Sequence, residues 1–255
     1  MEKVFRVKMF EVHEHARLAS TNAEALRRAG ELGDRHVIIA RQQESGRGQG
    51  SNRWESEPGK NITMTVAFRP REMPAGEQFA ISMAVALGTR DLVARYAGGS
   101  TVKWPNDVYV GDRKIAGILI EHVVAGDRLS ISLCGVGLNV NQTRFTSDAP
   151  NPVSLAMLLG RELPLEGVLE GLLESIDARY RSVDDPLALR RDYLACLYRG
   201  TGLGEWEDAR GRFTATIEGV DRHGQLLLRD ESGRTRRYGF KEVWRVPNGT
   251  ASDAG

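Results

Sequence analysis

The chain has 255 residues with 35 basic and 34 acidic side chains, so its net charge is close to zero. This balance gives no basic face of the kind that neutralises a nucleic-acid backbone, and we expect no DNA binding. No apolar run approaches the roughly 18 residues that a membrane span requires, and charges interrupt the N-terminus before a signal-peptide core could form. We therefore expect a cytoplasmic protein without membrane contact, long enough for one large core and a small second domain.

The cysteines and histidines give no metal-binding pattern, so any metal ligands remain unknown from the sequence. Cys134 and Cys196 are far apart in the chain, which is typical of a reduced protein rather than of a metal site. We expect structural or surface roles for the scattered histidines, which are His13, His15, His36, His122 and His223.

The first hundred residues predict strands and one long helix. A short strand is expected around residues 4–12, a β-prone run follows at 36–41, and residues 61–68 alternate apolar with polar side chains. Residues 77–96 are rich in helix formers with a helical apolar period, which predicts a long packing helix.

A shorter helix is predicted over residues 22–29. Thr21 and Glu24 have the spacing of a capping box at its start. Together with Ser20 and Asn22, Thr21 would either only cap the helix or offer hydroxyl and backbone N–H groups to a small polar ligand.

The loop between the second and third predicted strands has the composition of a ligand site. Residues 43–54 contain three glycines, two arginines and a terminal tryptophan. Glycine lets a backbone approach an anion closely, arginine offers several planar donors, and tryptophan can serve as an apolar cover. A loop of about twenty residues is also longer than compact domains usually carry without a function.

A hairpin is predicted in the middle of the chain. Strands at residues 108–110 and 115–124 are joined by a turn at 111–112. Asp107 and Lys114 would then lie near one end of a sheet, where a carboxylate and an ammonium could act together. As a surface ion pair alone they would contribute little to stability.

A second hairpin leads into a strand at residues 129–136 that ends in Gly135-x-Gly137. Glycines at a strand end admit a ligand close to the backbone, but the third glycine and the helix of a dinucleotide-binding motif are missing. Helices are predicted at residues 155–159, 165–180 and 186–198.

The composition changes at the glycine-rich residues 200–204, which we interpret as a hinge. Short β-prone runs follow, which predict a small barrel of three or four strands. We therefore expect one domain over residues 1–200, a small β domain over 201–247 and a disordered tail over 248–255. The predicted strands of the small domain are 213–220, 225–229 and 235–240.

Five motifs give the chain a resemblance to the biotin protein ligase family. They are S-T-N, a Q-x-x-G-R-G loop that ends in tryptophan and is followed by G-x-N, K-W-P-N-D, K-x-A-G-I-L, and G-x-G-x-N. They occur in this order at residues 20–22, 43–61, 103–107, 114–119 and 135–139. Each motif alone is weak evidence, but five in order are specific.

The resemblance implies an α+β fold with a mixed or antiparallel central sheet flanked by helices. This is the biotin/lipoate ligase catalytic fold, which is similar to that of class II aminoacyl-tRNA synthetases, followed by a small C-terminal SH3-like β-barrel. Only nineteen residues precede Ser20. We therefore expect a monofunctional ligase without the N-terminal DNA-binding domain that some relatives carry.

The resemblance also implies a two-step acyl transfer. The carboxylate of biotin attacks the α-phosphate of ATP, with Mg²⁺ as cofactor, to give biotinyl-adenylate and pyrophosphate. A lysine of a biotin carboxyl carrier domain then attacks the mixed anhydride. Two anions must meet in the first step, so cationic groups would offset their repulsion. An exposed edge of the central sheet could also pair two chains in a homodimer.

The family assigns three sets of residues in this sequence. The catalytic set is Lys114, Asp107 and Arg47. The biotin-binding set is Ser20, Thr21, Asn22, Gln43, Gly46, Arg47, Gly48, Gln49, Trp54, Lys114 and Gly117. The nucleotide-binding set is Arg47, Gly48, Gln49, Asn106, Lys114 and Asn139.

The loop departs from the usual family pattern in its second half. Where many relatives have G-R-G-R-x-G-R, this chain has Gln49 for the second arginine, Ser51 for the third glycine and Asn52 for the last arginine. The loop is therefore less cationic, and we expect more of the phosphate binding to fall to Lys114 and the metal.

Three other functions compete with a biotin ligase. A lipoate or octanoate ligase would share the fold but tends to have an R-R-x-S-G-G loop, which residues 46–49 do not resemble. A non-catalytic biotin-binding regulator would not need Asp107 and Lys114. A nucleic-acid-binding protein is supported only by the small β domain and the arginines of residues 234–237.

Overall fold

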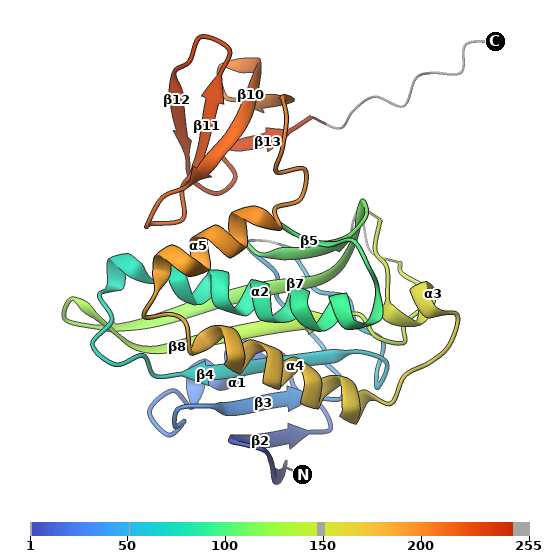
Figure 1. Cartoon of the computed structure of the whole chain (residues 1–255). Coiled ribbons are helices and arrows are strands. Elements are labelled where there is room, and N and C mark those ends of the chain that lie inside the picture. The colour runs from blue at the N-terminus through green and yellow to red at the C-terminus, as the bar shows by residue number, and fades with distance from the viewer. Residues whose placement is uncertain (1, 51, 147–150, 247–255) are drawn as a thin grey trace.

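An eight-stranded sheet forms the larger part of the computed structural model, which describes residues 2–50, 52–146 and 151–246 (Figure 1). Its strand order is β1-β2-β3-β4-β8-β7-β6-β5, with β2 and β3 parallel and the other neighbours antiparallel. The strands are β1 (Glu2–Val7), β2 (Phe10–His15), β3 (His36–Ala40), β4 (Ile62–Phe68), β5 (Ser100–Lys103), β6 (Asp107–Val110), β7 (Arg113–Ala125) and β8 (Arg128–Leu138).

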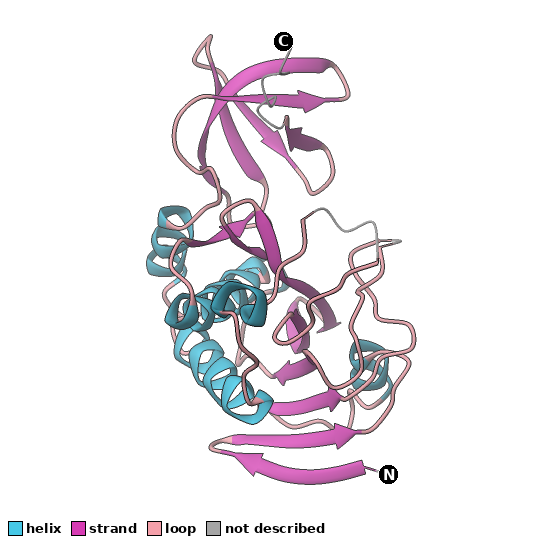
Figure 2. Cartoon of the chain, turned by 90° about the vertical axis from the view of Figure 1, so that its right-hand side faces the viewer, coloured by secondary structure: helices cyan, strands magenta, loops and turns pink. Residues whose placement is uncertain are grey.

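Helices cover both faces of this sheet. Figure 1 shows α2, α4 and α5 on one face, and the side view of Figure 2 shows most of the helical mass on that side. The short helix α1 packs on the opposite face against β3, β4 and β8. The helices are α1 (Thr21–Arg27), α2 (Phe79–Tyr96), α3 (Leu155–Leu159), α4 (Leu165–Tyr180) and α5 (Pro186–Ala195), with a 3₁₀ turn at Ala75–Glu77.

The main core lies between the large sheet and α2, α4 and α5. Strand β4 is buried along its whole length because both faces of the sheet are covered there. Helix α2 is apolar nearly all round and is buried through most of its length. The predicted α+β architecture with a mixed central sheet is confirmed.

A second, five-stranded antiparallel sheet follows α5, in the order β12-β11-β10-β9-β13. It lies beyond the β5 end of the large sheet (Figure 1). The sequence predicted β10, β11 and β12 but missed β9 and β13, which are the first and last of the five along the chain. The strands are β9 (Gly204–Asp208), β10 (Gly211–Val220), β11 (Leu226–Asp230), β12 (Thr235–Tyr238) and β13 (Val243–Arg245).

Two local predictions near the N-terminus are wrong. The single strand expected around residues 4–12 is a hairpin of β1 and β2, because the chain turns at Lys8, where φ is +53°. The capping box is also absent: Ser20 is the N-cap of α1, and no side chain caps the helix from that position. The tertiary structure supplies the cap instead, because the Oε1 atom of Gln43 accepts the N–H of Thr21 at 2.8 Å.

Helix length and cysteine state can be read directly from the part of the chain that the structure describes. No helix there is long and apolar enough to cross a membrane. Both cysteines are free thiols, and Cys134 is buried. The tail predicted to be disordered, residues 248–255, lies outside the described residues, as does Ser51.

Candidate functional site

A cavity of about 550 Å³ lies between the start of α1, the loop that joins β3 to β4, and strands β7 and β8. This volume is within the range of roughly 300–1,000 Å³ typical of small-molecule sites. Its walls are partly apolar, with Trp54, Phe145 and Phe240 among the lining residues, and partly polar. The cavity is therefore suited to a ligand that has an apolar body and polar ends.

Lys114 and Asp107 form an ion pair on the wall of this cavity. The Nζ atom of Lys114 lies 2.6 Å from Oδ2 of Asp107, and both side chains are partly buried. The β6–β7 hairpin creates the pair, because Asp107 begins β6 and Lys114 follows the turn. The Nζ atom also lies 5.9 Å from the centre of the Trp54 ring, so a cation, a carboxylate and an aromatic face meet at one point.

A second lysine lies just outside the cavity. Lys103 is packed over the rings of Tyr109 and Tyr198, at 5.3 and 6.0 Å from their centres. Burial lowers the pKa of the Lys103 amine, because the charged form loses hydration there.

Two glycines make room for the Trp54 ring. A Cβ atom on Gly137 would lie 2.3 Å from Cε2 of Trp54, and one on Gly117 would lie 2.9 Å from Cζ3. Both distances are shorter than any real carbon contact, so the indole rests on bare backbone of β7 and β8. The sequence predicted that such glycines admit a ligand, whereas in this structure they admit a side chain.

Gly135 makes room for the side chain of Asn22. A Cβ atom on Gly135 would lie 2.0 Å from Oδ1 of Asn22. The amide of Asn22 is held by three partners: it donates to the carbonyl of Leu119 at 3.1 Å and to Glu121 at 3.0 Å, and it accepts from Thr65 at 2.6 Å. Asn22 therefore ties the start of α1 to the floor of the cavity.

The glycine-rich loop is folded into a tight antiparallel turn. The N–H of Trp54 donates to the carbonyl of Gly46 at 2.9 Å, and the N–H of Gly48 donates to the carbonyl of Asn52 at 2.8 Å. A Cβ atom on Gly46 would lie 2.4 Å from the Trp54 carbonyl oxygen, so only glycine fits there. The half-exposed Arg47 is anchored from the loop to Glu121 of β7 at 3.2 Å.

Two buried polar atoms on the cavity wall have no hydrogen-bond partner among the described residues. They are the Nε1 donor of Trp54 and the Oδ1 acceptor of Asn139, whose Nδ2 is already bonded to the carbonyl of Val153. Because an unpaired buried polar group is costly, a donor and an acceptor left open on one cavity point to a polar ligand.

The C-terminal sheet contributes to the site. Phe240, which follows β12, lines the cavity and lies 6.1 Å from Trp104, ring centre to ring centre. Trp104 in turn donates its Nε1–H to the carbonyl of Gly224 at 2.9 Å. A Cβ atom on Gly50 would lie 2.7 Å from Nζ of Lys241, so the glycine-rich loop and the C-terminal sheet meet.

Comparison with known proteins identifies the family of this chain. The profile of the biotin/lipoate A/B protein ligase family matches residues 14–139. The biotin–[acetyl-CoA-carboxylase] ligase of Paracoccus denitrificans is 33% identical over 228 residues, which are 86% of this chain and 94% of that protein. The chain belongs to the biotin protein ligase family.

Other members of this family give the same picture. The biotin–[acetyl-CoA-carboxylase] ligase of Mycobacterium tuberculosis is 33% identical over 86% of this chain and 83% of that protein. The bifunctional ligase/repressor BirA of Bacillus subtilis is 29% identical over 79% of this chain, and the match spans only 64% of the BirA length. The fold is similar to the biotin protein ligase of Aquifex aeolicus in complex with biotin and ATP, with a TM-score of 0.76 at 19% identity over 92% of this chain and 99% of that one.

The structure brings most residues of the family's predicted site together on the cavity. The predicted residues that line it are Ser20, Thr21, Asn22, Gln43, Arg47, Gly48, Gln49, Trp54, Asp107, Lys114, Gly117 and Asn139. Gly46 and Asn106 do not line it. Gly46 is packed against the Trp54 backbone, and the buried Asn106 is bonded to Ser82 at 3.2 Å.

Sequence reasoning missed three kinds of residue at this site. The apolar Phe145 and Phe240 carry no local signal, because they lie outside the five motifs. Arg53 was noted for its charge but was not assigned a role. Glu121 does not line the cavity, yet it holds both Asn22 and Arg47. Its position two residues after the K-x-A-G-I-L run was a usable signal.

Proposed function

We propose that this chain is an ATP-dependent biotin protein ligase. It would condense biotin with ATP to give biotinyl-5′-AMP and pyrophosphate, and then transfer the biotinyl group to a lysine of a biotin carboxyl carrier domain. The observation that carries the proposal is the Lys114–Asp107 pair on the wall of a cavity that the glycine-rich loop and Trp54 also line. Family membership supports it independently.

Lys114 is proposed to act in the first step. When the biotin carboxylate attacks the α-phosphorus, two anions approach each other and negative charge accumulates on the phosphate oxygens. A fixed ammonium lowers the free energy of that arrangement more than a mobile one would, because it needs no reorganisation. The contact with Asp107 and the nearby Trp54 ring hold the Lys114 ammonium in place before substrate arrives.

Asp107 is proposed to act in the second step. The acceptor lysine enters as an ammonium and must lose a proton before its amine attacks the anhydride carbonyl. The new amide bond forms as the bond between the acyl carbon and the phosphate oxygen breaks, and AMP leaves. A carboxylate at the cavity wall can orient the incoming ammonium and accept its proton. Asp107 becomes available for this once the phosphate has drawn Lys114 away from it.

The glycine-rich loop is proposed to bind the phosphate and exclude water. Arg47 is anchored to Glu121 but is half-exposed, so it can contact a ligand anion without losing its anchor. Trp54 covers the floor formed by Gly117 and Gly137. Exclusion of water matters because a mixed anhydride hydrolyses readily. In this proposal the biotin-binding and nucleotide-binding residues are those that line the cavity.

The donor set fits Mg²⁺. This ion prefers oxygen ligands and is usually held by one or two carboxylates together with substrate phosphates. The lining offers the carboxylate of Asp107 and the unpaired Oδ1 of Asn139. These two groups would hold the metal beside the phosphates in the first step, where its charge would offset theirs. Asp107 would be free of it for the second step, once pyrophosphate has left.

The decisive test is isotope exchange between pyrophosphate and ATP. Labelled pyrophosphate should enter ATP when biotin is present and not when it is omitted, because the first step is reversible. Lipoate and octanoate should be tested in parallel, since the family profile includes lipoate ligases. Exchange that depends on lipoate would favour the related ligase, and binding of biotin without exchange would favour a regulator.

We propose finer features that follow from the same assignment. The C-terminal five-stranded sheet would be an SH3-like barrel, and the larger domain a relative of class II aminoacyl-tRNA synthetases, with domains at residues 1–200 and 201–247. The acceptor would be a carrier domain of a biotin-dependent carboxylase. The enzyme would act in the cytoplasm. A homodimer would form through an exposed sheet edge such as β1, which analytical ultracentrifugation can test.

A further inference from the structure

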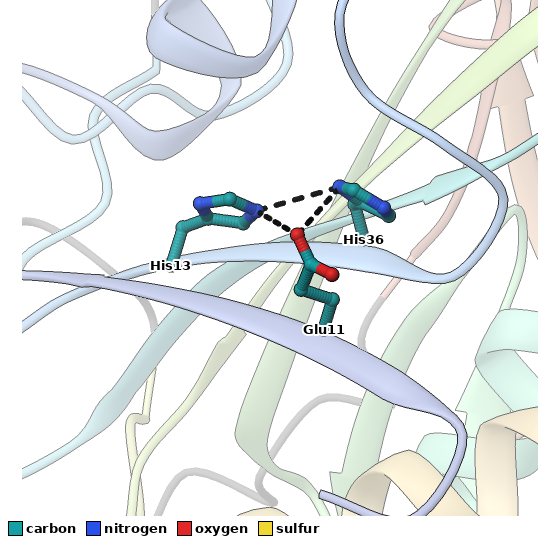
Figure 3. A group of neighbouring side chains, drawn as sticks. All are labelled: Glu11, His13 and His36. Atoms are coloured by element: carbon teal, nitrogen blue, oxygen red, sulfur yellow. Dashed lines mark hydrogen bonds and ion pairs between the residues drawn. The ribbon is translucent and has the colours of Figure 1, made fainter. Parts of the chain in front are cut away.

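Three side chains that could bind a metal converge at the parallel pair of strands, β2 and β3. Figure 3 shows Glu11 and His13 of β2 and His36 of β3 pointing toward one point. Glu11 pairs directly with His36 across the two strands, and His13 is two residues further along the same face. None of the three lines the cavity described above. This group is therefore separate from the proposed ligase site.

The distances among the three groups are those of a metal site. The Nε2 atom of His13 lies 3.3 Å from Oε1 of Glu11 and 3.4 Å from Nδ1 of His36, and the third distance, from His36 Nδ1 to Glu11 Oε1, is 3.7 Å. Tetrahedral Zn²⁺ with bonds of about 2.0–2.1 Å places its ligands about 3.3 Å apart. An ion can thus reach all three atoms after small side-chain movements.

The carboxylate of Glu2 orients the His13 ring so that its other nitrogen can bind a metal. The Nδ1 atom of His13 lies 2.8 Å from Oε1 of Glu2. A carboxylate at this distance favours the tautomer that carries its proton on Nδ1. In the neutral ring the lone pair is then on Nε2, which faces Glu11 and His36. Histidines that bind metals are commonly oriented by such a carboxylate on the other nitrogen. His13 is also 94% buried, since its exposed fraction is 6%.

The charged side chains around the three groups are compatible with a bound dication. The carboxylate of Glu2 is bonded to Arg28 at 2.8 Å, and Arg6 lies 3.9 Å from the Oε2 atom of Glu11. Arg28 also lies 3.4 Å from the carboxylate of Glu31, so three carboxylates surround two arginines. Glu11 and His36 are only partly buried, so water can supply a fourth ligand.

We propose that Glu11, His13 and His36 bind a divalent transition metal of the Zn²⁺ class. Two imidazoles and one carboxylate form a donor set for zinc, cobalt and iron rather than for Mg²⁺ or Ca²⁺, which take oxygen ligands. The bound ion would join β2 to β3 near the edge of the large sheet. It would raise the stability of the folded chain by mass action, because the unfolded chain does not hold the three groups together.

The competing explanation is a simple hydrogen bond between the two histidines. Their rings are stacked with centres 5.4 Å apart, and the 3.4 Å between the two nitrogens is long for a hydrogen bond. Such a pair would need no metal and would not bind one selectively.

The test uses the full chain without a histidine tag, stripped of metals with a chelator. Zn²⁺ is added in competition with a chromophoric indicator, and Co²⁺ is added separately to record its visible absorption. We expect one equivalent of Zn²⁺, an intense Co²⁺ spectrum typical of four-coordinate sites, and a higher melting temperature with metal. Absence of stoichiometric binding would overturn the proposal.

Variants assign the binding to these residues. His36→Gln and Glu11→Gln should each weaken Zn²⁺ binding at least tenfold and remove the effect of metal on melting. Glu2→Gln, which removes the orienting carboxylate together with its ion pair to Arg28, should weaken binding about 10–100-fold. His223→Gln serves as the matched control, because His223 is exposed and distant in sequence from this group. Circular dichroism checks that each variant is folded, and equal binding by all of them would contradict the assignment.

Discussion

The ammonium of Lys114 lies 2.6 Å from the carboxylate of Asp107, on the wall of the cavity. Each of these two charges can exchange its present partner for a substrate group. Lys114 can bind the phosphate in the first step, and Asp107 can bind the ammonium of the acceptor lysine in the second. This relationship links the two half-reactions of the proposed ligase to one hairpin.

Removal of Lys114 should affect the first step most. We expect Lys114→Ala to lower biotin-dependent pyrophosphate exchange by at least a hundredfold, because the fixed cation that stabilises the phosphate charge is lost. Lys60→Ala is the matched control, since Lys60 forms an ion pair of the same 2.6 Å length with Glu162 but does not line the cavity. Similar activity in the two variants would show that the Lys114 pair is only structural.

Removal of the Asp107 carboxylate should affect transfer at least as much as adenylation. Asp107→Ala should slow the single-turnover transfer from preformed biotinyl-adenylate to a carrier domain by at least tenfold. The measurement separates the steps, because no ATP is present. A variant that transfers at the normal rate while exchange falls would place Asp107 in the first step instead.

A methyl group beneath Trp54 should weaken ligand binding. In Gly137→Ala the new Cβ atom would lie 2.3 Å from the indole, so the ring must move. We expect at least a tenfold increase in the Kd of biotin by calorimetry. Gly98→Ala is the control, because a Cβ atom there meets nothing within 4 Å. Unchanged affinity in Gly137→Ala would show that the Trp54 position is unimportant for binding.

Restoring an arginine to the loop should strengthen nucleotide binding. Gln49 lines the cavity, so Gln49→Arg can add a charge-assisted contact to phosphate. We expect the KM for ATP in the exchange assay to fall about tenfold, and Gln49→Glu to raise it. If the arginine variant binds ATP no better or worse, the loop does not contact the phosphates.

Stability should fall as the pH is lowered through the range where histidine titrates. Burial lowers the pKa of His122, whose Nδ1 lies 2.9 Å from Oγ of Ser132. Below about pH 6.5, His122 is protonated in the unfolded chain but stays neutral in the folded chain. The free energy of unfolding therefore decreases as the pH falls. The loss continues until the pH reaches the lower folded pKa.

Urea unfolding at several pH values between 5 and 8 measures this effect. His122→Gln should reduce the pH dependence. Burial also lowers the pKa of His36, so the His122 variant should retain part of the slope. An identical slope in the wild type and in His122→Gln would contradict the prediction.

The sequence predicted the elements whose signals are local. The β6–β7 hairpin was predicted from its turn residues, and Gly111 does adopt a positive φ of 58°. The long helix α2 was predicted from its composition. Short strands such as β5 and β13 were missed, because three or four residues carry too little periodicity and their pairing partners decide their conformation.

The sequence by itself determined which chemical groups the protein has and their order along the chain, which was enough to indicate the family and the cavity residues near the five motifs. Only the tertiary structure decided what each group touches. It showed that Gly135 and Gly137 receive Asn22 and Trp54, and that Phe240 reaches the cavity from the second sheet. It also brought His13 and His36 together, whereas the sequence predicted only structural or surface roles for scattered histidines. The physical reason is that strand pairing joins residues with no fixed separation in the chain, so no local pattern records the contact.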